Sequence, residues 1–303
     1  MNFREKAQIL NEFALKLFAF AFMALDHIGL FLLSYRGSGD VAGLVLRAIG
    51  RLAFPLFAFM LAEGMRKSHH PGKYLLRLTL MWALVTVAQL VMFYGFSSSE
   101  IGASTNAFTD LILGGLFLYC LSLPGWKKSL SGLPLLAILA TYVLQVLRIN
   151  SVVVFPKAFP LFLFPGYSLF GFALILGFYY SKPLVDRISS KYLSGSGQSL
   201  ESFQETRAYQ GLLNSVSAAI LFLVTLLGWA ISYIPSFQFD VVTMQGIAPG
   251  TVGQTWCLLS ALLLFLYNGK RGPDGKAIRI CTYAFYPVHL AVIFLTFLLI
   301  FGY

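Results

Sequence analysis

Residues 13–33 read FALKLFAFAFMALDHIGLFLL, an apolar run broken only by Lys16, Asp26 and His27. About 20 predominantly apolar residues are enough for a helix to cross the hydrocarbon core of a bilayer. The run is too long for the apolar region of a signal peptide, contains charges and is not followed by an A-x-A cleavage site. The stretch therefore predicts a retained transmembrane helix over 12–35.

Runs of similar length and composition recur along the whole chain. We expect nine spanning helices, within a range of eight to ten, over 12–35, 42–65, 73–95, 106–123, 132–148, 159–181, 211–234, 251–267 and 277–300. The start of the sixth is crowded by Pro156, Pro160 and Pro165, and prolines disrupt the interior of a helix. Residues 152–164 could therefore form an interfacial or re-entrant segment at the outer face, with the span beginning near Gly166.

The composition of the chain indicates the same class. Of its 303 residues 58% are hydrophobic and 11% are charged, whereas about 25% of the residues of a soluble domain are charged. So little charge cannot cover a soluble body of this size, the apolar content excludes disorder, and continuous apolar runs exclude a β-barrel. We predict an all-α polytopic membrane bundle that forms one domain over 1–303. Its one long loop is 182–210, where SGSGQS is typical of a flexible linker.

The positively charged residues give the orientation, because cytoplasmic loops of membrane proteins carry an excess of Lys and Arg. With the N-terminus inside, 16 of the 22 Lys and Arg residues fall on the inner side, and Arg36, Arg148 and Lys157 fall on the outer side. The inner set is Arg4, Lys6, Arg66, Lys67, Lys73, Arg77, Lys127, Lys128, Lys182, Arg187, Lys191, Arg207, Lys270, Arg271, Lys276 and Arg279. We therefore expect a cytoplasmic N-terminus and a cytoplasmic loop over 182–210. The net charge of +10 then reflects topology, and we expect the lipid bilayer rather than nucleic acid as the partner.

The cysteines argue against a disulfide framework and against a metal site. Cys120, Cys257 and Cys281 are odd in number, lie in or at the ends of apolar runs, and form no CxxC pair. We expect buried free thiols and no bound metal.

Eight ionisable side chains fall within the predicted spans, where such residues are costly and are functional candidates by default. They are Lys16, Asp26, His27, Arg47, Arg51, Glu63, Asp110 and His289. A rise of about 1.5 Å per residue places Lys16 and Glu63 at similar depth in the inner leaflet, and Asp26, His27 and Arg51 near the middle. We expect Lys16 to pair with Glu63, and Arg51 to meet Asp26 or His27.

Five blocks of sequence resemble the TraX family of membrane proteins. They are FMALDHIGLF (22–31), RLAFPLFAFMLAEG (51–64), KYLLRL (73–78), LYNGKRG (266–272) and YAFYPVHL (283–290). The blocks occur in the expected order over about 12–295, and 124–250 carries the least likeness. Proteins of this family are polytopic and are implicated in N-terminal acetylation of pilin. The resemblance therefore implies a multi-pass protein of the bacterial cytoplasmic membrane that acts as an acetyltransferase with acetyl-CoA as donor.

A looser similarity points to the same chemistry. The spacings of Lys16 with His27 and of Arg47 with Arg51 resemble patterns in bacterial membrane O-acyltransferases that decorate surface glycans. Neither likeness identifies the acceptor, which could be a protein N-terminus such as that of pilin, or a surface glycan.

Acyl transfer needs a base for the acceptor proton, a group that stabilises the oxyanion and a site for the CoA phosphates. We expect His27 to be the base, because an imidazole changes its protonation near neutral pH. Asp26 is a further catalytic candidate, although its position next to His27 favours a pairing with Arg51. His289 could be a second base, an oxyanion donor, a nucleophile or only an interhelical hydrogen-bonding residue, with Tyr286 one turn earlier as its support.

Several other residues are candidates for binding substrate or CoA. Arg47 and Arg51 share a helix face and could bind an anionic acceptor or the CoA pyrophosphate, or they could simply pair with Asp26 and Asp110. Cations nearer the inner side could hold the CoA phosphates or only set topology: Arg66, Lys67, Lys73 and Arg77, and Lys270 and Arg271 in the NGKRG turn, which lacks the Ser or Thr of a P-loop. Lys16, Glu63 and Asp110 complete the candidates, although a structural pair explains the first two more simply.

A secondary transporter or exporter is the alternative function. Midplane charges and proline-interrupted helices also occur in transporters. No internal repeat is apparent and nine spans give unequal halves, so we favour the enzyme. Substrate flux across liposomes without acetyl-CoA would favour the transporter.

Overall fold

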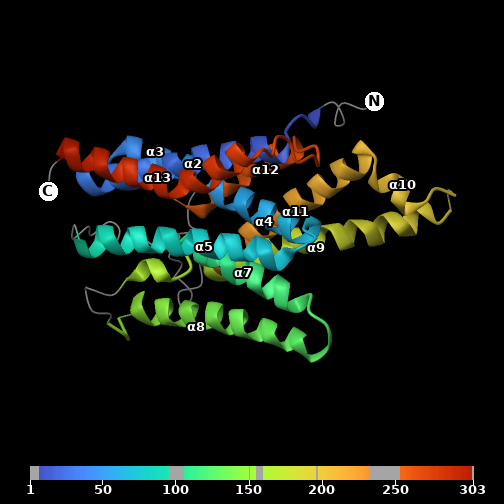
Figure 1. The fold of residues 1–303 in the computed structure, drawn as a ribbon, viewed down its shortest axis with the longest axis horizontal. Coiled ribbons are helices and arrows are strands. Elements are labelled where there is room, and N and C mark those ends of the chain that lie inside the picture. Colours follow the sequence, from blue (N-terminus) through green and yellow to red (C-terminus); the bar gives the residue numbers. More distant parts are fainter. Residues whose placement is uncertain are drawn as a thin grey trace.

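The chain forms a bundle of helices (Figure 1). The structure, a computed structural model, describes residues 7–95, 106–149, 151–154, 160–195, 197–232 and 253–301. In chain order the helices are α2 (Glu12–Arg36), α3 (Val41–Gly50), α4 (Ala53–Lys67), α5 (Pro71–Leu90), η1 (Val91–Gly95), α7 (Ala107–Leu121), η2 (Gly125–Ser131), α8 (Gly132–Ile149), η3 (Leu161–Leu163), α9 (Ser168–Leu193), α10 (Leu200–Gln204), α11 (Arg207–Ser232), η5 (Gln254–Leu259), α12 (Ser260–Phe265) and α13 (Lys276–Phe301). Within these residues seven helices are long and apolar enough to cross a membrane, and α7 and η5–α12 are shorter apolar helices. The predicted all-α polytopic membrane bundle is confirmed.

The nine predicted spans match these segments in order, but the sixth begins later than 159. α9 begins at Ser168, after the short turn η3 and after Pro160 and Pro165. Phe162 in η3 is fully buried, so this part of the chain packs inside the bundle. The expected continuous span over 159–181 is therefore wrong, and the alternative start near Gly166 is confirmed. Pro156 lies outside the described residues.

The second span is broken in its middle, where the sequence predicts one helix over 42–65. α3 ends at Gly50, α4 begins at Ala53, and Arg51 and Leu52 form a turn between them. The cause is Pro55, because a proline has no N–H to donate to the carbonyl four residues earlier and its ring crowds that carbonyl. Arg51 and Leu52 keep helical dihedral angles, and the N–H of Arg51 still donates to the carbonyl oxygen of Arg47 (3.1 Å). α3 and α4 therefore form one span with a local irregularity at these two residues.

The segment 182–210, predicted as a flexible loop, is largely helical where the structure describes it. α9 and α11 both extend into the segment, and α10 lies between them. The carboxylate of Asp186 on α9 accepts hydrogen bonds from Tyr209 (2.6 Å) on α11 and from Gln204 (2.8 Å) on α10. The prediction of a loop over this whole length is wrong. The polar side chains, which the sequence suggests are solvated, form hydrogen bonds between the helices instead.

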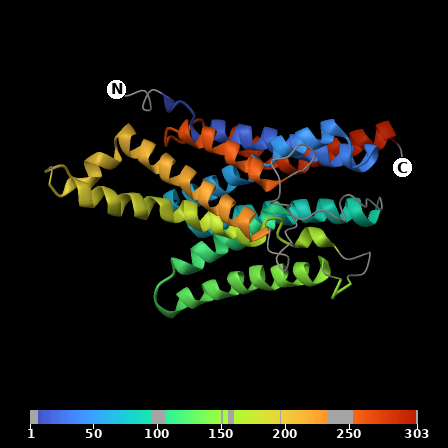
Figure 2. The ribbon, with the colours of Figure 1, turned by 180° about the vertical axis from the view of Figure 1, so that it is seen from behind.

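α4 is the central helix of the bundle. In the apolar 18-residue stretch of the span made of α3 and α4, 56% of the residues are buried. The corresponding share is 17% for the span that contains α8, which lies at one edge of the bundle in Figure 1. The main hydrophobic cluster includes Phe54, Leu56, Phe59 and Leu61 of α4 together with buried residues of α2, α7, α9 and α11. α13 lies beside α2 in both Figure 1 and Figure 2, and the two helices pack together. α2 therefore packs against both α4 and α13.

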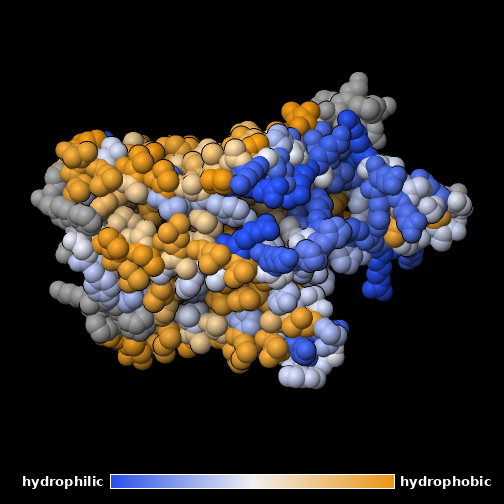
Figure 3. Space-filling view, in the orientation of Figure 1, coloured by the Kyte–Doolittle hydropathy of each residue, from blue (hydrophilic) through white to orange (hydrophobic). Residues whose placement is uncertain are grey.

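One end of the molecule is polar. Figure 3 shows apolar residues over most of the visible face and hydrophilic residues gathered at the end where α2, α5 and α13 begin. The hairpin of α9 and α11 projects at the same end (Figure 2). α13 ends on the opposite side, as an odd number of crossings requires. That the polar end faces the cytoplasm stays a prediction, and Arg4, Lys6 and Lys157 lie outside the described residues.

The cysteines are all free. Cys257 is buried as predicted, and Cys120 is partly buried. Cys281, on α13, is exposed, contrary to the prediction. Within the described ranges, no three His, Cys, Asp or Glu side chains are grouped so that they could hold a metal ion.

Candidate functional site

Two histidines meet between α2 and α13. Nδ1 of His27 lies 3.0 Å from Nε2 of His289, although the two residues are 262 positions apart in the chain. Nδ1 of His289 lies 2.9 Å from the carbonyl oxygen of Phe285, one turn earlier on α13. The rings of Phe285 and His289 stack with centroids 4.9 Å apart. The structure therefore brings together the two histidines that the sequence singled out.

The carbonyl of Phe285 fixes the protons of this pair. A carbonyl can only accept, so Nδ1 of His289 carries a proton and donates it to Phe285. In a neutral His289 the other nitrogen, Nε2, is then an acceptor, and Nδ1 of His27 must be the donor to it. Nε2 of a neutral His27 consequently has a lone pair available for an incoming proton.

Asp26 lies between two arginines rather than with its neighbour His27. Its carboxylate forms an ion pair with Arg47 and a second, of 3.4 Å, with Nη2 of Arg51, whose side chain is 6% exposed. α2 and α3 can approach so closely because Gly50 has no side chain, and a Cβ there would lie 2.5 Å from Oδ1 of Asp26. The predicted contact between Asp26 and Arg51 is confirmed.

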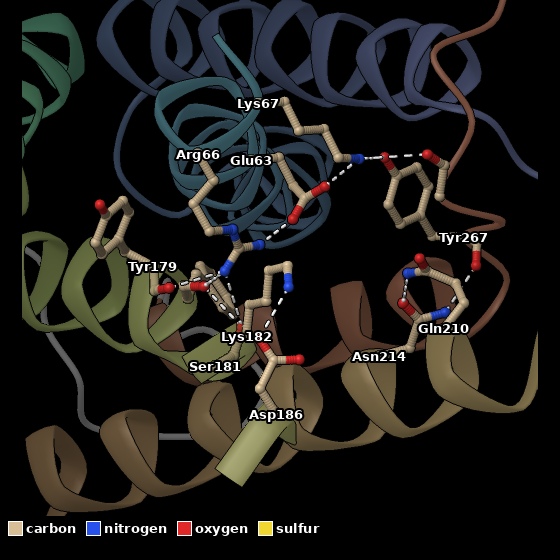
Figure 4. A network of polar contacts seen from close by, with 12 residues as sticks. Glu63, Arg66, Lys67, Tyr179, Ser181, Lys182, Asp186, Gln210, Asn214 and Tyr267 are labelled. Atoms are coloured by element: carbon tan, nitrogen blue, oxygen red, sulfur yellow. Dashed lines mark hydrogen bonds and ion pairs between the residues drawn. The ribbon is translucent and has the colours of Figure 1, made fainter. Parts of the chain in front are cut away.

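Glu63 and Lys16 do not pair with each other. Glu63 forms an ion pair with Arg66 and another, of 2.5 Å, with Lys67, both on its own helix (Figure 4). Arg66 also donates to two backbone carbonyls of α9, at 2.6 and 2.9 Å. Lys16 instead lies 3.7 Å from Glu12, one turn earlier on α2. The predicted pair between Lys16 and Glu63 is wrong, and the network of Glu63 holds α4 against α9.

Asp110 caps a helix and meets neither arginine. Its carboxylate accepts hydrogen bonds from the backbone N–H groups of Gly166 (2.6 Å), Tyr167 (3.1 Å) and Ser168 (2.6 Å), at the start of α9. Its side chain is buried on α7. The expected alternative pairing of Arg51 with Asp110 is therefore wrong, and the contacts of Asp110 explain its buried charge without a substrate.

Tyr286 connects the histidines to an apolar cavity. Its ring meets the ring of His289 edge-on at a centroid distance of 5.1 Å and that of His27 at 6.0 Å. Tyr286 also lines a cavity of about 130 Å³ among α2, α4, α5, α7 and α13. Lys16 and Tyr74 line the same cavity toward the polar end, and most of its other lining residues are Phe, Met and Leu.

A second cavity, of about 390 Å³, lies at the polar end where α4 leads into α5. We call it the basic cavity. Its charged and imidazole side chains include Lys67, His69, His70, Lys73, Arg77 and Arg271, and Glu12 is the carboxylate among its lining residues. Tyr74 lines both cavities. Three of the four cations that the sequence placed near CoA phosphates line it: Lys67 at the end of α4, and Lys73 and Arg77 in the first turns of α5.

The NGKRG turn packs against the start of α2. The carbonyl oxygens of Lys270 and Arg271 accept hydrogen bonds from the N–H groups of Glu12 (2.8 Å) and Phe13 (3.3 Å). The guanidinium of Arg271 lies 2.9 Å from Asp274 and lines the basic cavity, whereas Lys270 is exposed and is not among the lining residues. The turn thus offers carbonyl acceptors to α2, and of its two cations Arg271 faces a cavity.

Several residues of this region were missed by the sequence analysis. Tyr74, His69 and His70 were not singled out, although KYLLRL places Tyr74 beside Lys73 and one turn from Leu78. The carbonyl of Phe285 carries no signal in the sequence, since any residue has one. His69 and His70 precede Pro71. Proline is favoured at the first position of a helix, so a helix start predicted at Pro71 would have placed both histidines just before it.

Comparisons with known proteins match part of the chain. The model of a family described as TraX protein matches residues 12–156. The match includes the first three of the five resembling blocks and does not reach the two blocks between 266 and 290, so it is shorter than the expected 12–295. No curated protein and no solved structure matches the chain.

Proposed function

We propose that this chain is an integral membrane acetyltransferase, because the model of the TraX family matches residues 12–156. It moves an acetyl group from acetyl-CoA to an amine or hydroxyl acceptor at the membrane. The resemblance to proteins implicated in pilin acetylation supports the reaction class. The contact between His27 and His289 supports the assignment of the reacting centre, because it places a base in a span where an idle imidazole would be costly.

His27 is the general base in this proposal. Its Nε2 accepts the proton of the acceptor as the acceptor nitrogen or oxygen forms a bond to the thioester carbonyl carbon. The carbon–sulfur bond then breaks, and His27 returns the proton to the departing CoA sulfur. The chain thereby ends in its starting protonation state, so no further reactant is required.

His289 is a positioning residue. Both of its ring nitrogens are engaged, one by the Phe285 carbonyl and one by His27. When His27 accepts a proton at Nε2, its Nδ1–H donates a charge-assisted hydrogen bond to Nε2 of His289, and such bonds are about twice as strong as neutral ones. This arrangement argues against His289 as the nucleophile that carries the acetyl group, because its lone pair already accepts from His27.

The location and acceptor follow from the same resemblance. We place the chain in a bacterial cytoplasmic membrane with its polar end inside, where acetyl-CoA is found. The acceptor is a protein N-terminus such as that of pilin, or a surface glycan. Asp26 on α2, Arg47 on α3 and Arg51 directly after α3 lie near the histidines, where the arginines could orient an anionic acceptor.

Transfer of labelled acetyl groups tests this function. Membranes that contain His27→Ala are expected to lose transfer from acetyl-CoA by a factor of about 10² to 10⁴, which is what a general base contributes. His289→Ala should lower kcat by roughly 10- to 100-fold and leave KM for acetyl-CoA unchanged, since it removes one hydrogen bond to a charged group.

Ser34→Ala is the control, because Ser34 is exposed on the same helix as His27 and faces neither cavity. It should retain full transfer. Undiminished transfer by a folded His27→Ala protein would remove His27 from the mechanism. Flux of the same substrate across liposomes in the absence of acetyl-CoA would instead favour the transporter.

A further inference from the structure

The basic cavity is not used by the proposed chemistry at the histidines. We propose that it binds phosphate groups, namely the phosphates of the acyl donor, and that Tyr74 marks the point where the donor passes from the basic cavity into the apolar one. This inference rests on the proposed function and assigns the donor site, its orientation and the end from which the donor enters.

The charge of the cavity fits a polyanion. Four cations, Lys67, Lys73, Arg77 and Arg271, line it against the single carboxylate of Glu12. Lys67 and Arg271 have carboxylate partners, Glu63 at 2.5 Å and Asp274 at 2.9 Å. For Lys73 and Arg77, no ion pair is found with any residue that the structure describes. These two cations lie one turn apart on one face of α5 and are available to a ligand.

The start of α5 adds backbone donors to the same cavity. The cap residue His70 makes no side-chain hydrogen bond to the helix, and Pro71 occupies the first helical position. The first N–H groups of a helix have no partner within it, and together with the helix dipole they favour a bound anion. The Lys73 and Arg77 side chains and this helix end therefore face one space of about 390 Å³.

The apolar cavity fits the rest of the donor. It adjoins the basic cavity at Tyr74 and reaches Tyr286, whose ring contacts both histidines. Eleven residues of α2 separate Lys16 at its polar end from His27, a helical rise of about 16 Å. A donor with its phosphates at the polar end and its thioester at the histidines is an elongated amphipathic molecule, which suits a basic and an apolar cavity that share Tyr74 as a wall residue.

Anionic lipid is the other source of phosphate at such a place. A lipid headgroup could meet Lys73 and Arg77, but its acyl chains would stay among the other lipids. No part of a lipid bound in this way would occupy the apolar cavity that extends between the helices from Tyr74 to Tyr286. The apolar cavity on the other side of Tyr74 therefore favours the donor over a lipid.

Binding measurements on the full chain in nanodiscs test the inference. In neutral-lipid nanodiscs, the double variant Lys73→Gln/Arg77→Gln is expected to bind CoA at least tenfold more weakly than the unchanged chain. Its affinity for pantetheine, which has no phosphate, should stay the same. The control is Lys127→Gln/Lys128→Gln, which removes two cations of the same end that do not line the basic cavity and should leave CoA binding unaltered.

Further measurements distinguish the donor from anionic lipid as the source of the phosphate, and distinguish this inference from the catalytic proposal. Nanodiscs with phosphatidylglycerol should give the same CoA affinities, and equal amounts of this lipid should co-purify with both proteins. Unchanged CoA binding by the double variant overturns the inference, as does a loss of co-purified phosphatidylglycerol with unchanged CoA binding. His27→Ala should bind CoA normally while it loses transfer, so failure of the catalytic assignment would leave the binding result intact.

Discussion

Asp26 holds two arginines at a depth where an unpaired charge is expensive. Arg51 is almost fully buried, and Arg47 and Asp26 are 19% and 17% exposed at their side chains. Removal of one partner of a buried pair leaves the other charge without compensation, which is more damaging than the loss of the pair as a whole. Within this group the carboxylate of Asp26 therefore contributes most to stability, since it is the counter-charge of both arginines.

The variant Asp26→Ala is expected to lower the free energy of unfolding by about 3 kcal/mol, because two buried guanidinium groups lose their counter-charge. The matched control is Asp274→Ala. Asp274 also bridges two arginines, Arg271 and Arg279, but their side chains are 72% and 52% exposed. Its loss should cost about 1 kcal/mol or less. Denaturation in detergent measures both, and equal losses would contradict the role assigned to Asp26.

For a single residue, the sequence predicts the depth of the side chain in the membrane but not the neighbour toward which it points. Depth along the helices was enough to pair Asp26 with Arg51, because their spans are consecutive and joined by a short connection. It failed for Lys16 and Glu63, since residues at equal depth on packed helices can face different neighbours. Arg66 and Lys67 lie three and four residues after Glu63, a spacing that favours pairing on one helix and that would have indicated the observed partners.

Among the elements, the start of α9 is stabilised by a side chain of another helix. Three backbone N–H groups at its start donate to Asp110 on α7, so a side chain 56 to 58 residues earlier in the chain acts as the cap. A helix terminus buried without an acceptor would leave these donors unpaired, at a cost comparable to that of a lost hydrogen bond.

Asp110→Ala is expected to cost about 2 kcal/mol of stability, because it leaves buried donors without an acceptor. Asp110→Asn should cost less, since the amide keeps one oxygen. Ser199→Ala, which removes the cap of the short and exposed α10, should change the free energy of unfolding by about 1 kcal/mol or less. Acetyl transfer per folded molecule should be unaltered in both Asp110 variants, and a selective rise in KM for acetyl-CoA would restore Asp110 as a binding residue.

The existence and order of the elements could be predicted, because about 20 apolar residues in a row have few alternatives to a spanning helix. Their interruptions were harder. Three prolines before Gly166 indicated that α9 could begin late. The effect of Pro55 on the second span was not predicted. The length of α9 and α11 beyond the apolar part could not be read either, since Asp186, Gln204 and Tyr209 become neighbours only after the two helices pair.

For the whole molecule, the polar end is the feature that decides orientation. Hydrophilic residues gather there in Figure 3, and the cavity at this end is lined by Lys67, Lys73, Arg77 and Arg271. The positive-inside rule assigns such an end to the cytoplasm. In a cysteine-free background of right-side-out vesicles, Val152→Cys should react with a membrane-impermeant maleimide. Ser131→Cys should react only after permeabilisation.

Both positions suit the experiment, because Val152 is 69% exposed and Ser131 ends the exposed turn η2 between α7 and α8. They lie at opposite ends of the span that contains α8. The reverse labelling pattern would invert the topology and would place the basic cavity on the side without acetyl-CoA.

The apolar cavity between Tyr74 and Tyr286 has a consequence for the energetics of the cell. Apolar cavities of this size, about 130 Å³, hold no ordered water when their walls offer few polar partners. Protons move along chains of hydrogen-bonded water, and the mostly apolar walls between Tyr74 and Tyr286 offer few partners to such a chain. A bundle with titratable groups at its centre can therefore sit in an energised membrane with little proton leak along this route.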